Sequence, residues 1–195
     1  FYSLVSHECI LPELSVATSI PKNHQDFKKS LPLELIDAPL FVQRKFHILK
    51  ERRLLSVNFY PFQEPNAIAT DPDQQVEIFL HTVPDFHYAT IIGERIDQYV
   101  DPVELFKSLS NLLASKGIVN LEVLLDASDL FGIEALIEAG FFPCMYFPCL
   151  KKQGDMRRDY VILAKSNRYF SYKKFVVNQI HLEYLRLFTN LVKQE

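Results

Sequence analysis

Cysteine, long apolar runs and a large net charge are all scarce in this sequence, and each scarcity excludes a class of protein. Three cysteines in 195 residues are too few, and odd in number, for a disulfide scaffold, and they favour a reducing compartment. No apolar run approaches the roughly 18 residues of a membrane-spanning helix. A net charge of −3 gives no general reason to expect nucleic acid or a membrane as a partner. We therefore expect a soluble, cytoplasmic protein.

We expect no signal peptide at the start of this sequence, because His7 and Glu8 are among its first ten residues. The sequence begins at Phe1 without a methionine, which indicates a fragment or a chain cut from a longer one. An upstream domain is therefore an open alternative. The composition, 48% hydrophobic and 23% charged, is that of a globular protein with one ordinary domain.

The first part of the chain is interrupted by proline at positions 12, 21, 32 and 39. Only short helices or extended segments fit between them. We expect an irregular segment over residues 1–52, either the start of the same domain or the remnant of an upstream one.

Three strands are predicted next, over residues 53–62, 75–83 and 87–96. Branched and aromatic residues fill the first, and apolar residues alternate in the second. Residues 66–74 read as a loop, and the short links indicate an antiparallel meander.

Two helices and a buried strand follow the meander. Residues 101–117 predict a helix with Asp101 as N-cap, Pro102 at its first position and a leucine-rich core face. Residues 120–127 are apolar enough for a buried parallel strand. A second helix, 129–140, ends at Gly140, the residue type that most readily adopts a left-handed helix stop.

The last elements are two strands and a helix. The strands span residues 141–150 and 157–166, with residues 151–156 as the turn. Prolines in the first of them suggest a bent or edge strand. Residues 178–194 predict an amphipathic helix, which would lie on its own sheet or form an interface, including one in a homodimer.

This order of elements resembles the GNAT family of acyl-CoA N-acyltransferases over residues 53–166. The likeness is strongest in "LSNLLASKGIVNLEVLLD" and in "IEALIEAGFFPCMYFP", where a helix ends before an aromatic strand. The resemblance implies an α/β fold with a mixed sheet, a GNAT-like domain over 53–170 and an extra C-terminal helix within 171–195. It also implies that the third strand of the meander separates from the next strand. The pantetheine of acyl-CoA would then bind along Ala89–Ile96.

The same resemblance implies transfer of an acetyl or other acyl group from acyl-CoA to a small-molecule or peptide amine, without a metal. Glu94 would be the general base, and its alternative is a carboxylate on the solvent face of the strand that pairs with Arg95. The donor would contact residues around the start of the two helices: Arg95, Ile96, Gln98, Tyr99, Val100 and Asp129.

Two departures from the family weaken the enzyme hypothesis. Glycines normally precede the first of these helices, and their amides hold the CoA pyrophosphate, whereas this chain has "RIDQYVDPVE". Carboxylates in that stretch suit an empty helix start better than a polyanion. Arg95, Lys107 or Lys116 would have to compensate.

The second departure concerns the acid that protonates the CoA thiolate. Leu136 stands where many family members have a tyrosine, so Tyr146, Tyr99 or water would supply the proton. The alternative function is therefore a non-catalytic GNAT-like module that binds a ligand or a partner.

Three further groups have functional and ordinary interpretations. His81, Asp85 and His87 are metal-ligand types, but an ordinary turn is the better interpretation. Cys144 or Cys149 would be a nucleophile only beside a histidine, so buried, inert thiols are favoured. Arg157 and Arg158 fit an anionic substrate less well than a hairpin in which one of them pairs with an acid.

Overall fold

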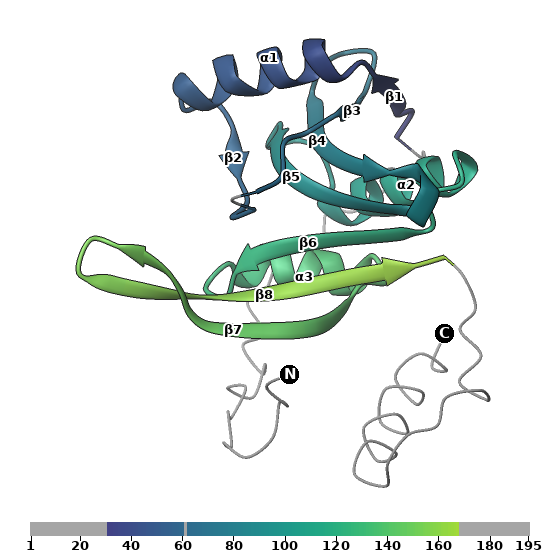
Figure 1. The fold of residues 1–195 in the computed structure, drawn as a ribbon. Coiled ribbons are helices and arrows are strands. Elements are labelled where there is room, and N and C mark those ends of the chain that lie inside the picture. Colours follow the sequence, from purple (N-terminus) through teal and green to yellow (C-terminus); the bar gives the residue numbers. More distant parts are fainter. Residues whose placement is uncertain (1–30, 61, 168–195) are drawn as a thin grey trace, which may run out of the picture.

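A mixed sheet of eight strands organises the computed structural model, which describes residues 31–60 and 62–167 (Figure 1). Along the sheet the strands follow the order β1-β3-β4-β5-β6-β8-β7, and β2 pairs with β5 outside this path. All neighbouring pairs are antiparallel except β5 with β6. The strands are β1 (Glu34–Asp37), β2 (Ser56–Val57), β3 (Ala67–Thr70), β4 (Val76–Val83), β5 (Tyr88–Ile96), β6 (Asn120–Asp126), β7 (Phe142–Gln153) and β8 (Met156–Ser166).

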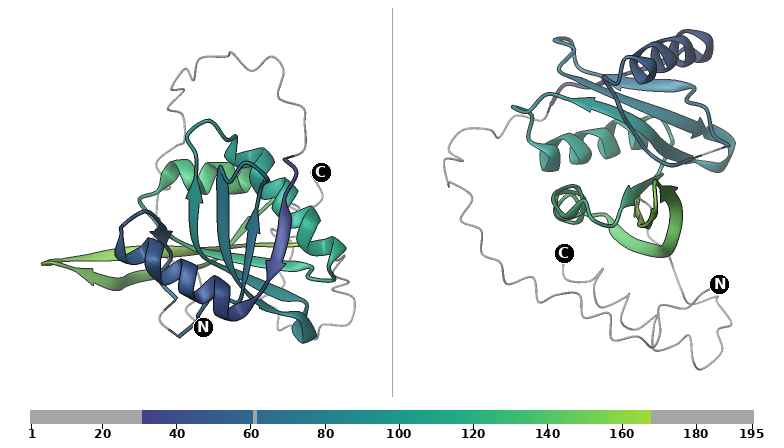
Figure 2. Two further views of the ribbon diagram at one scale, coloured as in Figure 1. Left: turned by 90° about the horizontal axis from the view of Figure 1, so that it is seen from above. Right: turned by 90° about the vertical axis from the view of Figure 1, so that its left-hand side faces the viewer.

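The helices cover both faces of this sheet, as the turned views show (Figure 2). Helix α1 (Pro39–Glu51) lies on one face, and α2 (Pro102–Ser115) with α3 (Leu130–Glu138) on the other. A 3-10 turn, η1 (Pro84–Phe86), links β4 to β5. The mixed α/β fold predicted from the sequence is confirmed.

Each face of the sheet has its own apolar core. The larger core lies under α2 and α3, where Leu105, Leu109 and Leu113 of the predicted helix face are fully buried against the strands. The smaller core joins Val42 and Phe46 of α1 to one face of β3, β4 and β5. Side chains that alternate along β5 therefore enter different cores.

The predicted helix ends are also present. Asp101 caps α2, and its Oδ1 accepts a hydrogen bond from the Val103 amide at 2.9 Å. Gly140 adopts a φ of +88°, which a residue with a side chain adopts only under strain. The amides of Gly140 and Phe141 bond back to the carbonyls of Ile137 and Leu136, so the chain leaves α3 directly into β7.

The expectation of an irregular segment over residues 1–52 is wrong for residues 34–51. Strand β1 pairs with β3, and α1 begins at Pro39. A proline interrupts a helix interior but suits its first position, where no amide donor is needed. Reading Pro39 as a break therefore hid the helix. Residues 1–30, including His7, Glu8 and Cys9, lie outside the described residues.

The predicted strand over residues 53–62 is also wrong, since Ser56–Val57 alone forms a strand among the described residues of this range. The first strand of the meander is instead β3, in the stretch that we expected to be a loop. Alanine has a weak strand preference, but Ala67 and Ala69 are almost completely buried, and burial outweighs propensity. The second and third strands of the meander are confirmed as β4 and β5.

The last hairpin is longer than predicted. β7 and β8 continue through most of the expected turn, which shrinks to Gly154 and Asp155. Figure 1 shows this hairpin extending beyond the rest of the sheet. β7 is an edge strand, in agreement with its prolines. The predicted helix over 178–194 lies outside the described residues.

Candidate functional site

The centre of the sheet contains a local separation of two strands. β5 pairs with β6 only from Tyr88 to Ile91, opposite Asn120–Val123. The register between β4 and β5 then shifts, because Leu80 faces Ile91 whereas Phe79 faces Gly93, which places Ile92 in a bulge. Beyond the bulge, β5 continues to Ile96 without β6. The predicted separation of the third strand from the next one is thus present.

A short segment of the same chain occupies the edge of β5 at this separation. In β2, Ser56 faces Glu94 and Val57 faces Gly93. The Asn58 amide then donates to the Ile92 carbonyl at 2.9 Å, and Asn58 Nδ2 donates to the Ile91 carbonyl at 3.0 Å. We call residues 56–60 the strap.

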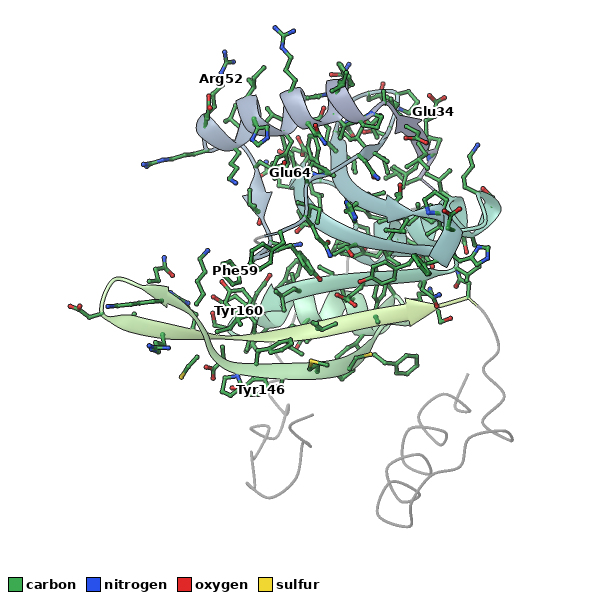
Figure 3. The ribbon with its side chains drawn as sticks, viewed as in Figure 1. Glu34, Arg52, Phe59, Glu64, Tyr146 and Tyr160 are labelled. Atoms are coloured by element: carbon green, nitrogen blue, oxygen red, sulfur yellow. The ribbon has the colours of Figure 1, made fainter. Side chains whose placement is uncertain are left out.

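The strap also contacts the strands on the other side of the separation. The Tyr60 hydroxyl donates to Glu122 Oε1 of β6 at 3.0 Å. The Phe59 ring lies 6.0 Å from the Tyr160 ring of β8, and both are labelled side by side in Figure 3. Lys151 Nζ of β7 lies 5.3 Å from the centre of the Phe59 ring. The strap therefore bridges β5 to β6, β7 and β8.

Glu94 lies at the separation, on the face of the sheet that α2 and α3 cover. Its partner Ile78 points into the larger core, so Glu94 points towards α2 and α3. Its Oε2 atom is buried and, among the described residues, has no hydrogen-bond partner. Burial, and then the negative charge of Asp129, raises the pKa of Glu94 to about 7. The alternative of a solvent-facing carboxylate paired with Arg95 is wrong.

A second carboxylate, Glu122, lies on the opposite face of the sheet with two tyrosines. Its neighbours in β6, Leu121 and Val123, enter the larger core, so Glu122 points away from α2 and α3. Burial, and then Glu122, raises the pKa of Tyr60 far above its usual range. Burial also raises the pKa of Tyr88 to about 12, and Glu122 adds to this. The cluster thus combines one carboxylate with two tyrosine hydroxyls, and no cation contributes to either tyrosine pKa.

Thr90 completes this cluster. It is fully buried opposite Glu122, and its Oγ1 makes no hydrogen bond within normal distance limits to any described residue. It nevertheless lies near enough to the Tyr88 hydroxyl to offset part of the pKa increase of that residue. Glu122 was not predicted as a site residue, although a single acid between the apolar Leu121 and Val123 is a signal in the sequence.

The start of α2 offers few amides to a phosphate. Pro102 has no amide hydrogen, the Val103 amide is bonded to Asp101, and Asp97 Oδ1 accepts from the Tyr99 amide at 3.1 Å. Two carboxylates therefore already occupy this turn. The expected weakness of a pyrophosphate site here is consistent with these contacts.

The residues predicted to contact the donor lie in different surroundings. Arg95 Nε donates to Glu77 Oε2 at 2.7 Å, so its side chain is held on the α1 side. Ile96 and Val100 pack against the larger core, whereas Gln98 and Tyr99 are exposed. Lys107, named as a compensating cation, contacts Glu104 at 3.4 Å.

The remaining predicted site residues lie around α3. Asp129 caps this helix and accepts from the Gly132 amide at 3.1 Å, and its charge reaches Glu94. Leu136 is buried in the core, so no acid stands at the family's tyrosine position. The Tyr146 hydroxyl donates to Asp159, and this contact, followed by the Cys149 amide, holds the pKa of Asp159 below its usual range.

The histidines of the η1 turn have separate partners. His81 Nδ1 lies 2.8 Å from the Glu64 carbonyl, and His87 Nδ1 lies 2.8 Å from the Gly117 carbonyl. Within the described ranges, no three metal-ligating side chains come together. The turn interpretation therefore agrees with these contacts.

The two cysteines of β7 are exposed, so the prediction that they are buried is wrong. Most residues of β7 are exposed on both faces of the strand, because little of this edge strand is covered by other described elements. Partial desolvation still raises the pKa of the Cys144 thiol, so it is not an activated thiolate. Arg158 lies 3.5 Å from Asp126, which confirms the expected pairing with a neighbouring acid.

In the described part of the chain, no helix combines the length and the apolarity that crossing a membrane requires.

Comparisons with known proteins agree on the architecture. No protein-family model and no curated protein matches the sequence. A candidate phosphinothricin N-acetyltransferase matches at 14% identity and a TM-score of 0.50, over 71% of this chain and 100% of its own. The ribosomal-protein-S18-alanine N-acetyltransferase from Escherichia coli matches at 14% identity and a TM-score of 0.50, over 74% of this chain and 99% of its own. This chain has the fold of the GNAT N-acetyltransferases.

Proposed function

We propose that this protein transfers an acyl group, such as acetyl, from acyl-CoA to an amine. The observation that supports this most is the separation of β5 from β6, with a carboxylate on each face of the sheet. Glu94 lies on the face covered by α2 and α3, and Glu122 lies on the opposite face. A thioester at the bulge of β5 would meet backbone amides that polarise its carbonyl. The acceptor is a small-molecule or peptide amine.

The two carboxylates suit different roles, Glu94 that of a general base and Glu122 that of a binding group for the amine. A general base works best when its pKa lies near the operating pH, and burial brings the pKa of Glu94 to about 7. Glu94 would take the proton that the amine loses. Glu122, with the Tyr60 and Tyr88 hydroxyls beside it, suits an incoming ammonium group.

The proton for the leaving thiolate has less obvious sources. Tyr146 is engaged with Asp159, and Tyr99 is exposed in the turn before α2. We propose Tyr146 as the acid, with the Asp159 carboxylate orienting its hydroxyl. Replacing Tyr146 with phenylalanine would then lower kcat more than it changes KM.

A second candidate is a binding module that keeps the fold without the reaction. Two contacts favour it: the strap takes the edge of β5, and Asp101 takes an amide at the start of α2. Both contacts use groups to which the CoA arm and pyrophosphate would bind.

One experiment separates these functions. Acetyl-CoA is titrated into the purified protein by calorimetry, and thiol release is then followed with a panel of primary amines. Micromolar binding with amine-dependent thiol release supports the enzyme. Replacing Glu94 with glutamine is expected to lower kcat/KM by about 10²- to 10⁴-fold and to remove the limb of the pH profile near 7.

The matched control is Glu122→Gln, the same change on the other face. Here we expect a higher KM for the amine with the pH limb retained, because Glu122 binds and does not take the proton. No binding at millimolar acetyl-CoA would leave the binding module as the function of this chain.

A further inference from the structure

We propose that the strap and the acyl donor compete for the same edge of β5, so that the donor must displace residues 56–60 in order to bind. This inference rests on the proposed function. It concerns how the site opens and which residues oppose the donor.

The edge of β5 at the separation is already occupied by the strap. A β-strand has two hydrogen-bonding edges. In β5, β4 pairs with one edge from Tyr88 to Ile96, so the opposite edge is the one that remains for another partner. At the separation, β2 pairs with Gly93 and Glu94, and Asn58 bonds to the carbonyls of Ile91 and Ile92. A pantetheine arm laid along these residues would need the same backbone groups.

The close approach of the strap to β5 requires a residue without a side chain at Gly93. A Cβ atom at this position would lie 2.8 Å from the Ser56 carbonyl oxygen and 3.1 Å from the Phe46 ring. Backbone atoms cannot move away as a side-chain tip can. Glycine inside a strand often marks such a close backbone approach, so the contact is specified by the sequence.

The strap connects the two sides of the separation. Asn58 holds β5, whereas Tyr60 holds the Glu122 carboxylate on β6 (Figure 3 shows the neighbouring Phe59 against Tyr160). Displacement from β5 would therefore also release the Tyr60 hydroxyl from Glu122. In this way, donor binding would expose the carboxylate that faces the amine.

The test compares two asparagines that anchor a loop to a strand. Asn58→Ala removes the side-chain bond to Ile91, whereas Asn66→Ala removes equivalent bonds to Thr82 of β4, away from the separation. Binding of CoA is measured by calorimetry for the full chain and both variants. We expect Asn58→Ala to bind CoA about two- to tenfold more tightly, the effect of one net hydrogen bond, and Asn66→Ala to bind like the unmodified chain.

A second measurement, amide hydrogen exchange, reports whether the strap stays paired with β5. The Asn58 amide bonds to Ile92, so saturating CoA is expected to speed its hydrogen exchange. Gly93→Ala, which pushes the strap from β5, should tighten CoA binding as Asn58→Ala does.

The outcomes separate this inference from the proposed function. CoA binding by the unmodified chain, with Asn58 still protected and no gain in Asn58→Ala, would overturn the competition and leave the acyltransferase in place. Failure of CoA to bind the unmodified chain and both strap variants would overturn both. Tighter binding in Asn58→Ala together with lost protection supports both.

Discussion

Two glutamates on neighbouring strands show how differently this protein treats a carboxylate. Glu77 of β4 is fully buried on the α1 side, where Lys45 contacts one oxygen and Arg95 Nε donates to the other at 2.7 Å. Glu94 of β5 faces the α2 side, where its buried Oε2 has no partner in the described chain and Asp129 adds a second negative charge. The two carboxylates stand on adjacent, paired strands and point to opposite faces of the sheet.

Glu77 has the partners of a carboxylate that stabilises the fold, whereas Glu94 has the surroundings of a candidate functional group. Glu77 links α1 to β4 and β5 through two cations, so its charge is compensated. Glu94 has no such compensation from the described residues, and its ionised form costs stability. Uncompensated groups of this kind are concentrated at functional sites, which is why we propose Glu94 as the base.

The largest expected effect comes from removing the compensated carboxylate. Glu77→Ala leaves Lys45 and Arg95 without their shared partner. We expect a loss of about 2–4 kcal/mol in the free energy of unfolding, because two charge-assisted contacts between α1, β4 and β5 are lost and a fully buried side chain is truncated. Urea denaturation at pH 7 measures this.

Lys45→Ala is the control for that prediction. Lys45 is 31% exposed, and Glu77 would keep Arg95, so the loss should be clearly smaller. If Glu77→Ala destabilised the protein no more than Lys45→Ala, the two glutamates would not differ as we argue.

The next effect has the opposite sign. The folded protein holds the proton of Glu94 more tightly than the unfolded chain does, so this group makes stability fall as the pH rises from about 4.5 to about 7. Glu94→Gln removes that loss. The variant should be more stable by on the order of 2–3 kcal/mol at pH 8 and about equal at pH 4.

Thermal or urea unfolding of both proteins across this pH range tests the prediction. If the difference in the free energy of unfolding between Glu94→Gln and the unmodified protein stayed constant from pH 4 to pH 8, the pKa of Glu94 would not be raised by folding. Glu77→Gln, measured in parallel, should not gain stability at high pH.

The smallest effect concerns the neighbour of Glu94. Asparagine caps helices as well as aspartate does, so Asp129→Asn should leave α3 intact. It removes the negative charge, which is the lesser cause of the raised Glu94 pKa after burial. The upper end of the pH range over which stability falls should therefore move down by a fraction of a pH unit. An upward shift would show that the charge of Asp129 does not raise the pKa of Glu94.

Much of the fold could be predicted from local patterns. The Asp101 cap, the leucine face of α2 and the glycine stop at Gly140 are short-range signals, and each corresponds to an observed contact. β1 and α1 were missed because Pro39 reads equally as a break or a helix start, and β3 was missed because its alanines have a weak strand preference. The burial of Ala67 depends on residues far along the chain.

The site was less predictable for the same reason. Glu94 could be named, but its face and its lack of a partner depend on the bulge at Ile92, which changes the alternation along β5. Glu122 and the strap required knowledge of which strands separate and what lies between them. That Tyr60 meets Glu122, 62 residues further along the chain, has no local signal.

The prolines of β7 have a consequence for how the molecule meets its own copies. β7 is the last strand of the sheet, and Pro143 and Pro148 offer no amide hydrogen along it. Register shifts beside both prolines further disturb the outer row of hydrogen-bonding groups. A second chain that tried to extend the sheet here would find an irregular template. The aromatic strand "FFPCMYFP" thus carries its own protection against aggregation.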